Sequence, residues 1–368
     1  MHLEPFKIQT SHLSIAGLKN NVLGGSPVIA LHGWLDNAAS FSFIADYLEL
    51  NRPFYAIDLP GHGLSDHRPS PANYHLVENI VDVLGFIDAL SLCIDKDIKQ
   101  PEKVTLIGHS LGGIICCLIA ASAPDRVKDV ILLDSMGPLT DETKNVLPQL
   151  RNAVTKAMQI KSKVSVFPTF ELAIRARMVG VGSINRLAAE ALVSRGLKVV
   201  EGGYSWTTDP KLLKPSFLRF TEAQVQAIFS GIACPVKLIR GENGYFSVYE
   251  SLEKRLGYFQ SLLLFFIFFI PQSFALTGEK ITDSLISNGA TVEYQDKKAY
   301  GSHQIVLSAP KRINNEIVIE KDRRIEGELN VILLRLPPSL SPSESFRRGE
   351  LFLAENGTLQ FQCQQLGS

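Results

Sequence analysis

The sequence predicts an α/β fold with a mostly parallel central sheet and helices on both faces. Short, wholly apolar runs recur along the chain and alternate with segments of helical spacing. Strands that are apolar on both sides are typical of parallel sheets covered by helices. Most of these runs end directly in polar residues or glycines. Since ligands of such sheets bind beyond the carboxyl ends of the strands, we expect the functional residues there.

The elements follow each other in the order that such a sheet requires. Residues 6–15 alternate apolar and polar residues, which predicts an edge hairpin. The spacing of 79–90 predicts a helix, and 113–121 predicts a second, buried one. The apolar runs that we assign to strands are 28–31, 54–57, 104–107, 130–133, 236–239 and 290–294.

Residues 139–229 interrupt this series, because they are helix-like and richer in charge. They predict a helical cap inserted between two parts of a core, 1–138 and 230–317. Trp206 is the most prominent aromatic residue of this cap. It is expected either to line a ligand cavity or to pack structurally, and both interpretations stay open.

The turn Gly-His-Ser-Leu-Gly at 108–112 joins the strand 104–107 to the helix 113–121. In this strand–turn–helix context, a G-x-S-x-G turn exposes its serine at the tip of the sheet as a nucleophile. The flanking glycines are needed because side chains there would collide with the neighbouring strand and helix. Ser110 is therefore the candidate nucleophile. The alternative is a glycine-rich turn with an incidental serine.

A serine hydroxyl is a weak nucleophile and needs a general base. With this type of turn, the order along the chain is Ser, then Asp or Glu, then His. The chain has eight histidines, and His303 alone follows Ser110. It comes after the last predicted strand, where a catalytic loop is expected. His303 is therefore the candidate base, and a solvated loop histidine is the alternative.

The acid that orients the base has two candidates. One location is a G-x-x-D turn after the strand 236–239, but this chain has Gly244 in place of the aspartate. Glu242 lies two residues earlier. Asp134 ends the preceding strand, which is the other location used for this acid, and it is the favoured candidate. Its alternative role is to cap the following turn.

An oxyanion hole needs two backbone N–H donors aimed at the developing negative charge. One is expected from Leu111, directly after the nucleophile. The other is expected from Trp34, directly after His32 and Gly33. His32 itself is expected to brace this loop rather than to react.

Three motifs, at 30–37, 58–65 and 108–113, together resemble the α/β-hydrolase superfamily. Within it, the chain resembles the serine hydrolase-like proteins of animals. The sequences Gly-Tyr-Phe at 244–246 and Gly-Ser-His at 301–303 add to this resemblance. The resemblance implies an α/β-hydrolase fold and serine hydrolase activity on a natural substrate not yet established. It also implies a cytosolic, perinuclear or peroxisomal location.

We expect hydrolysis of an ester or related acyl bond in a small molecule, through an acyl-enzyme on Ser110. No cofactor or metal is expected, because the five cysteines form no zinc-binding spacing. Dehalogenases and epoxide hydrolases share the fold but carry a carboxylate at the position of Ser110. The alternative from another class is a non-catalytic binding or scaffold protein, which the missing aspartate in the turn 241–244 favours.

Composition excludes some partners. Lys and Arg number 37, as do Asp and Glu, so the formal net charge is zero. Without a basic patch carrying interleaved aromatic residues, no nucleic acid partner is expected. The N-terminus has no apolar signal core and the odd number of cysteines fits a reducing compartment, so a cytoplasmic location is expected.

Two segments depart from the pattern of the resemblance. The stretch 256–278 is long and apolar enough to be scored as a membrane span. It falls between two strands of one predicted sheet, so we expect an apolar insertion and no membrane span. The segment 318–368, with a Pro- and Ser-rich stretch at 337–345, is expected to be a poorly ordered tail.

Overall fold

A computed structural model divides the chain into two compact units, Met1–Cys234 and Pro235–Ser368. In the first unit, the residues that the structure describes are 3–47, 52–94, 103–158, 165–180 and 182–234. In the second unit, they are 235–241, 254–269, 277–282, 291–297, 304–306, 311–313, 316–319, 329–335, 348–353 and 359–363.

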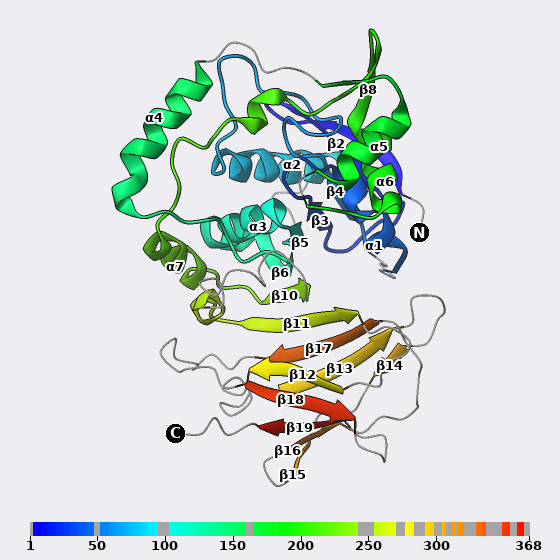
Figure 1. Cartoon of the computed structure of the whole chain (residues 1–368), viewed down its shortest axis with the longest axis vertical. Coiled ribbons are helices and arrows are strands. Elements are labelled where there is room, and N and C mark those ends of the chain that lie inside the picture. Colours follow the sequence, from blue (N-terminus) through cyan, green and yellow to red (C-terminus); the bar gives the residue numbers. More distant parts are fainter. Residues whose placement is uncertain are drawn as a thin grey trace. The chain divides into compact units, whose positions relative to one another are not determined.

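The first unit is built on a sheet with the strand order β1-β2-β4-β3-β5-β6 (Figure 1). β1 and β2 form the antiparallel hairpin expected at the edge, and β2 is antiparallel to β4. The strands β4, β3, β5 and β6 are parallel to one another. The bounds are β1 Glu4–Gln9, β2 Ser14–Lys19, β3 Val28–Leu31, β4 Phe54–Ile57, β5 Val104–His109 and β6 Val127–Leu133. The apolar runs predicted as strands in this unit are confirmed.

The register of the parallel strands brings their carboxyl ends to one edge. Leu31 of β3 is paired with Ile57 of β4 and with Gly108 of β5. His109 at the end of β5 is paired with Leu133 at the end of β6. The turns that follow β3, β4, β5 and β6 therefore start from the same edge, which we call the carboxyl edge.

Two helices on one face of this sheet extend the segments predicted as helical. α2 (Glu78–Ile94) places the Phe86 ring 6.2 Å from that of Tyr55 in β4, measured between centroids. α3 (Leu111–Ser122) follows the turn after β5 and contacts β3, β5 and β6. The two helices also contact each other.

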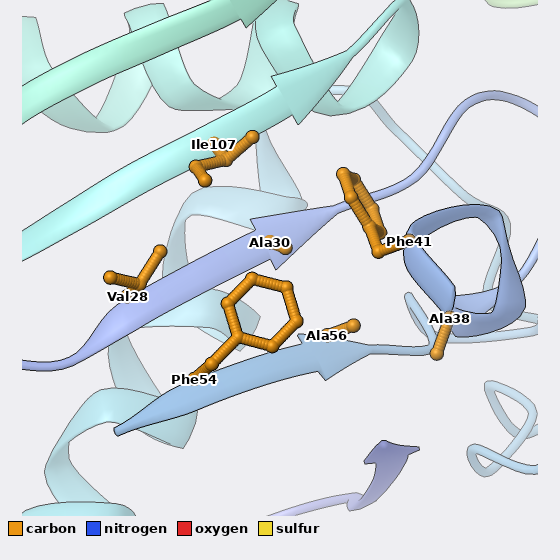
Figure 2. Close-up of a cluster of buried hydrophobic side chains, with 7 residues drawn as sticks. All are labelled: Val28, Ala30, Ala38, Phe41, Phe54, Ala56 and Ile107. Carbon is orange, nitrogen blue, oxygen red and sulfur yellow. The ribbon is translucent and has the colours of Figure 1, made fainter. Parts of the chain in front are cut away.

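The other face is covered by the short 3-10 helix η1 (Ala38–Phe41) and by α1 (Ser42–Tyr47). Phe54 and Tyr55 are neighbours in β4, so their side chains point to opposite faces. Phe54 joins side chains of η1 in a buried apolar cluster (Figure 2), which consists of Val28, Ala30, Ala38, Phe41, Phe54, Ala56 and Ile107. This cluster anchors η1 to the sheet. Helices therefore cover both faces of the sheet, as predicted.

The cap after β6 contains helices and a small antiparallel sheet. The helices are α4 Val146–Ala157, α5 Phe170–Met178, α6 Arg186–Gly196 and α7 Glu222–Ser230. The sheet has the order β7-β9-β8, with β7 Val166–Phe167, β8 Leu197–Val200 and β9 Gly203–Trp206. The prediction of a helix-like cap missed this sheet. Its hairpin turns through Gly202 and Gly203, both at positive φ, between apolar and aromatic residues that favour strands.

Trp206 packs inside the cap. Its ring lies 5.3 Å from that of Phe167 in an edge-to-face arrangement. It also packs against the buried cluster of α5 and α6, which consists of Ala173, Ile174, Ala189 and Val193. Of the two roles left open for Trp206, the structure supports structural packing.

The second unit begins with β10 (Val236–Gly241), which is parallel to β11 (Leu262–Phe269). β11 lies inside the apolar stretch 256–278, so that stretch contributes a strand that the sequence did not predict. Its branched and aromatic residues favour a strand. Among the helices that the structure describes, none has both the length and the apolar character needed to cross a bilayer.

The later strands of this unit are antiparallel. β13 (Thr291–Lys297), expected as part of a mostly parallel sheet, pairs with β17 (Leu329–Arg335) and β14 (Gln304–Val306). A second sheet has the order β12-β18-β19-β16-β15, with bounds Thr277–Thr282, Arg348–Leu353, Leu359–Cys363, Glu316–Ile319 and Lys311–Ile313. The structure thus places parts of 318–368 in strands, where the sequence predicts a poorly ordered tail. Apolar runs such as 331–334 have the propensity for this. The boundaries drawn between core, cap and tail stay predictions.

Candidate active site

Ser110 lies in a strained turn between β5 and α3. Its backbone has φ 48° and ψ −112°, a conformation that residues other than glycine rarely adopt. Ser110 is exposed and is the N-cap residue of α3. The positive end of the helix dipole therefore lies beside its hydroxyl and favours negative charge there.

Two glycines allow this turn to fit between its neighbours. A Cβ atom on Gly108 would lie 2.4 Å from the backbone nitrogen of Gly113. A Cβ atom on Gly112 would lie 2.0 Å from the carbonyl oxygen of Leu31, at the end of β3. Neither distance is compatible with a side chain. Both positions therefore require glycine, because a side chain would collide with neighbouring backbone atoms, as the sequence motif predicts.

The end of β6 holds the turn from the other side. The Ser110 N–H donates to the Leu133 carbonyl (3.2 Å), and the Ser135 hydroxyl donates to the Ser110 carbonyl (2.7 Å). Asp134 lies between these two contacts and has a positive φ of 43°. The structure thus brings Ser110 and Asp134 together at the carboxyl edge, both in strained backbone conformations. Ser135 was not singled out from the sequence.

The loop after β3 lies beside the N-terminus of α3. The Gly112 N–H donates to the His32 carbonyl, with a distance of 3.1 Å. Leu111 directly precedes Gly112, and Trp34 lies two residues after His32. These are the two residues predicted to supply oxyanion donors. Trp34 is 41% exposed, and its indole N–H donates to the Leu212 carbonyl of the cap (3.3 Å).

His32 connects the end of β3 to the segment after β4. Its Nε2 accepts from the Leu59 N–H (3.0 Å), so the proton is on Nδ1, which donates to the Gly33 carbonyl (2.7 Å). Burial lowers the pKa of His32 to about 4. It also lowers the pKa of His62, whose ring lies 4.9 Å from that of His32, to about 3. Both rings are therefore neutral at pH 7, and His32 has the bracing role expected for it.

Asp58 follows β4 and is fully buried. Its carboxylate accepts hydrogen bonds from the N–H groups of Ala38 (2.7 Å) and Leu64 (2.9 Å). The guanidinium of Arg195 in α6 donates to both of its oxygens at 2.7 to 3.1 Å. Because a buried carboxylate must be paired, the cap supplies the charge that this part of the core requires.

A second arginine of the cap makes a similar pair. Arg177 of α5 donates to Asp36 at 2.7 Å, and the two side chains are 14% and 10% exposed. No local pattern marks either arginine, because the paired residues are 137 and 141 positions apart in the chain. Only their partners, Asp36 and Asp58, lie in the motifs 30–37 and 58–65.

Not every predicted site residue is described. His303, the candidate base, and Glu242, the alternative acid, lie outside the described residues. The remaining candidates all lie at the carboxyl edge of the first unit, and they are Ser110, Asp134, Trp34 and Leu111. Their roles stay predictions.

The described part of the chain offers few residues that could bind a metal or react as a thiol. It contains no group of three or more His, Cys, Asp or Glu residues that could hold a metal ion. Cys116 and Cys117 in α3 are buried, and burial raises the pKa of both thiols well above the ordinary value. A neutral, buried thiol is a poor nucleophile. Ser110, which is exposed, is better placed to react.

The sheet order, the cap and the turn after β5 define an α/β hydrolase. A family model described as alpha/beta hydrolase fold matches residues 26–161. A serine hydrolase-like protein of Danio rerio is 30% identical over 230 residues, which are 61% of this chain and 68% of that protein. The chain belongs to the α/β-hydrolase superfamily and is similar to its serine hydrolase-like proteins.

Bacterial proteins show the same likeness. The crystal structure of a hypothetical protein of Pseudomonas aeruginosa matches with 37% identity and a TM-score of 0.65, over 70% of this chain and 88% of that one. A pimeloyl-[acyl-carrier protein] methyl ester esterase of Chromobacterium violaceum is 27% identical over 218 residues, which are 59% of this chain and 75% of that protein. Relatives named serine hydrolase and esterase support hydrolase activity for this chain.

Proposed function

We propose that the protein hydrolyses an ester or related acyl bond in a small molecule, through an acyl-enzyme on Ser110. The observation that carries the proposal is the strained, exposed position of Ser110 between β5 and the N-terminus of α3. A serine held in this way presents its hydroxyl to a substrate at the carboxyl edge. Nothing in a purely structural turn requires this strain.

Each candidate residue has one task in the proposed reaction. The Ser110 hydroxyl attacks the carbonyl carbon while His303 accepts its proton, and Asp134 fixes the tautomer and orientation of the histidine ring. The N–H groups of Trp34 and Leu111 donate to the oxygen of the tetrahedral intermediate. The intermediate then expels the leaving group, which takes the proton from His303. A water molecule releases the acyl group from Ser110 by the same steps.

The choice of an ester follows from the chemistry of the turn and from one relative. Attack by serine on a carbonyl carbon suits esters, thioesters and amides, of which activated esters react most readily. The relative from Chromobacterium violaceum is named for a methyl ester. We therefore take short alkyl and p-nitrophenyl esters as the first substrates to test.

Ser110→Ala tests the proposal directly. The wild-type chain should be labelled by a fluorophosphonate probe, and Ser110→Ala should lose all labelling because the probe reacts with an activated serine hydroxyl. Ser122→Ala is the matched control, since Ser122 is an exposed serine at the other end of α3. In-gel fluorescence measures the labelling, and circular dichroism checks the fold.

Two outcomes would contradict the proposal. Labelling that persists in Ser110→Ala would place the nucleophile elsewhere. A folded wild-type chain that neither takes the label nor cleaves any ester would favour the other candidate, a non-catalytic binding or scaffold protein. The glycine at 244, in place of the usual acid, is the observation that favours this second candidate.

A further inference from the structure

We propose that the cap holds the loop 33–38, which we call the oxyanion loop, in its working position. Arg177 and Arg195 are then positioning residues for the backbone N–H of Trp34. This inference rests on the proposed function, in which that N–H binds the developing oxyanion. The cap thereby affects the rate of the chemical step, in addition to any role in covering the site.

The oxyanion loop starts with a strained turn. The Asp36 N–H donates to the Gly33 carbonyl (3.1 Å), which closes a turn with Trp34 and Leu35 at its centre. Leu35 has a φ of 64°, a value that a leucine adopts only when its surroundings impose it. The direction of the backbone N–H of Trp34 depends on the shape of this turn. Contacts from outside the turn are therefore needed to maintain it.

The first of these contacts come from α5 and α6. Arg177 donates to the Asp36 carboxylate at 2.7 Å, which fixes the last residue of the strained turn. The next residue, Asn37, donates through its side-chain amide to the Leu192 carbonyl at 2.9 Å. Two successive residues of the oxyanion loop are thus bonded to two different helices of the cap.

The third contact is indirect and passes through a buried carboxylate. Asp58 accepts from the Ala38 N–H and is itself held by both donating nitrogens of Arg195. The Asp58 side chain is 0% exposed and that of Arg195 is 9% exposed, so water competes little for these bonds. Arg195 therefore determines where Asp58 can hold the end of the loop.

The core holds both ends of this segment. Leu31 ends β3, and Ala38 lies in the apolar cluster with Ala30 and Ala56 (Figure 2). Between these ends, the side chains of Asp36 and Asn37 reach to the cap. If the cap contacts are lost, the ends stay in place while the strained turn is free to relax. This predicts a kinetic defect without global unfolding.

Arg177 is the better position for the test. Removing Arg195 would leave the Asp58 carboxylate buried and unpaired, which destabilises the whole unit. Asp36 and Arg177 lie closer to solvent than Asp58 and Arg195, so Arg177→Gln leaves a less deeply buried charge behind. Arg186→Gln is the matched control. Arg186 lies in the same cap and pairs with Glu171 and Glu190 at 2.7 Å each, at a site that does not touch the oxyanion loop.

The first measurement is steady-state hydrolysis of a p-nitrophenyl ester. Arg177→Gln should lower kcat by roughly 10- to 100-fold with little change in KM, because a displaced donor weakens binding of the transition state more than that of the substrate. Arg177→Lys, which keeps the charge, should recover part of the loss. Arg186→Gln should behave as wild type. Equal kcat values in Arg177→Gln and wild type, or equal losses in Arg177→Gln and Arg186→Gln, would overturn the inference.

The second measurement does not depend on catalysis. Amide hydrogen exchange, read by mass spectrometry on peptides that cover residues 33–38, should be faster in Arg177→Gln than in wild type or Arg186→Gln. Unchanged exchange in this peptide would overturn the inference even if kcat falls. If the wild-type chain shows neither labelling nor hydrolysis, the proposed function fails. Faster exchange in Arg177→Gln alone would then still support restraint of the loop by the cap.

Discussion

At the scale of single residues, the position of Asp134 decides which acid we favour. Asp134 directly follows Leu133, whose carbonyl accepts from the Ser110 N–H. Its half-buried carboxylate therefore starts from the backbone beside the candidate nucleophile. A carboxylate at this edge can hold the Nδ1 proton of a histidine and fix its tautomer.

Asp134→Asn should keep the shape of the side chain but stabilise the wrong histidine tautomer. We expect kcat to fall by on the order of 10⁴, as in other triads. Glu242→Gln should have a much smaller effect. Ester hydrolysis by both purified variants measures the two effects, and near-ultraviolet circular dichroism shows whether each is folded. The opposite ranking would assign the role to Glu242, and two mild effects would argue against a working triad.

Much of the turn around Ser110 could be predicted from residues alone. The glycines at 108 and 112 are required by close contacts with Gly113 and Leu31, and they leave a motif because both lie within the turn itself, at fixed positions on either side of Ser110. Ser135 left none, because its hydroxyl acts on a carbonyl that is 25 positions away. Nor could the sequence show how far His303 lies from Asp134, because the two residues are far apart in the chain.

At the scale of elements, two neutral histidines join the ends of β3 and β4. His32 donates to the loop after β3 and accepts from the Leu59 N–H after β4. The ring of His62 packs against it, and its Nδ1 donates to the Pro60 carbonyl (3.1 Å). A proton on His32 Nε2 would remove the acceptor that Leu59 needs. The loops at the carboxyl edge therefore depend on both rings staying neutral.

This junction predicts how stability depends on pH. An unfolded chain protonates its histidines below about pH 6.5, whereas the folded unit resists protonation of His32 and His62 down to pKa values of about 4 and about 3. Their contribution to the free energy of unfolding is therefore fully present above about pH 6.5. It should fall toward lower pH by up to about 1.4 kcal/mol per pH unit for each ring. Denaturant titrations at a series of pH values measure this slope.

His32→Gln tests the origin of the slope. The glutamine can still accept from the Leu59 N–H but does not titrate, so the decline below about pH 6.5 should be shallower. His75→Gln is the control, because His75 is half-buried and its ring packs against that of Phe217. Equal slopes in wild type and both variants would show that the buried histidines do not cause the decline.

Element prediction succeeded where a pattern was local and failed where pairing decided the outcome. The runs at 28–31 and 104–107 are buried on both faces, and their composition alone indicates strands. The cap hairpin 197–206 is short and partly exposed, so it lacks a continuous apolar run. Arg177 and Arg195 lie on helices that the sequence placed only within a cap. Their pairing with the core depends on how that cap folds back.

At the scale of the whole molecule, the two units differ in composition. The chain has two tryptophans, Trp34 and Trp206, and both lie in the first unit. The described part of the second unit consists mainly of strands. Tryptophan fluorescence therefore reports on the first unit, whereas far-ultraviolet circular dichroism reports on both.

Unfolding of the full chain should show these units separately. In a guanidinium titration, we expect the fluorescence transition and the circular dichroism transition to have different midpoints, because two compact units need not unfold together. The buried apolar cluster and the Asp58–Arg195 pair lie in the first unit, so the fluorescence transition reports on their disruption. Coincident transitions would indicate that the two units unfold as one.

The sequence predicted the first unit far better than the second. The first follows an alternation of apolar strands and helical segments, and that alternation can be read from the sequence. In the second, β11 pairs with β17, and β13 pairs with the same strand from the other side. Such long-range antiparallel pairing between 262–269, 291–297 and 329–335 leaves no periodic signal that distinguishes it from an insertion or a tail.

Strain in the backbone gives a last reason to expect chemistry at this edge. In the described part of the chain, the residues other than glycine with positive φ are Leu35, Ser110 and Asp134. They follow β3, β5 and β6, whose ends meet at the carboxyl edge. Each such conformation costs about 1–3 kcal/mol. Glycine would adopt these conformations without strain, so a leucine, a serine and an aspartate at this edge favour a role in chemistry over a scaffold alone.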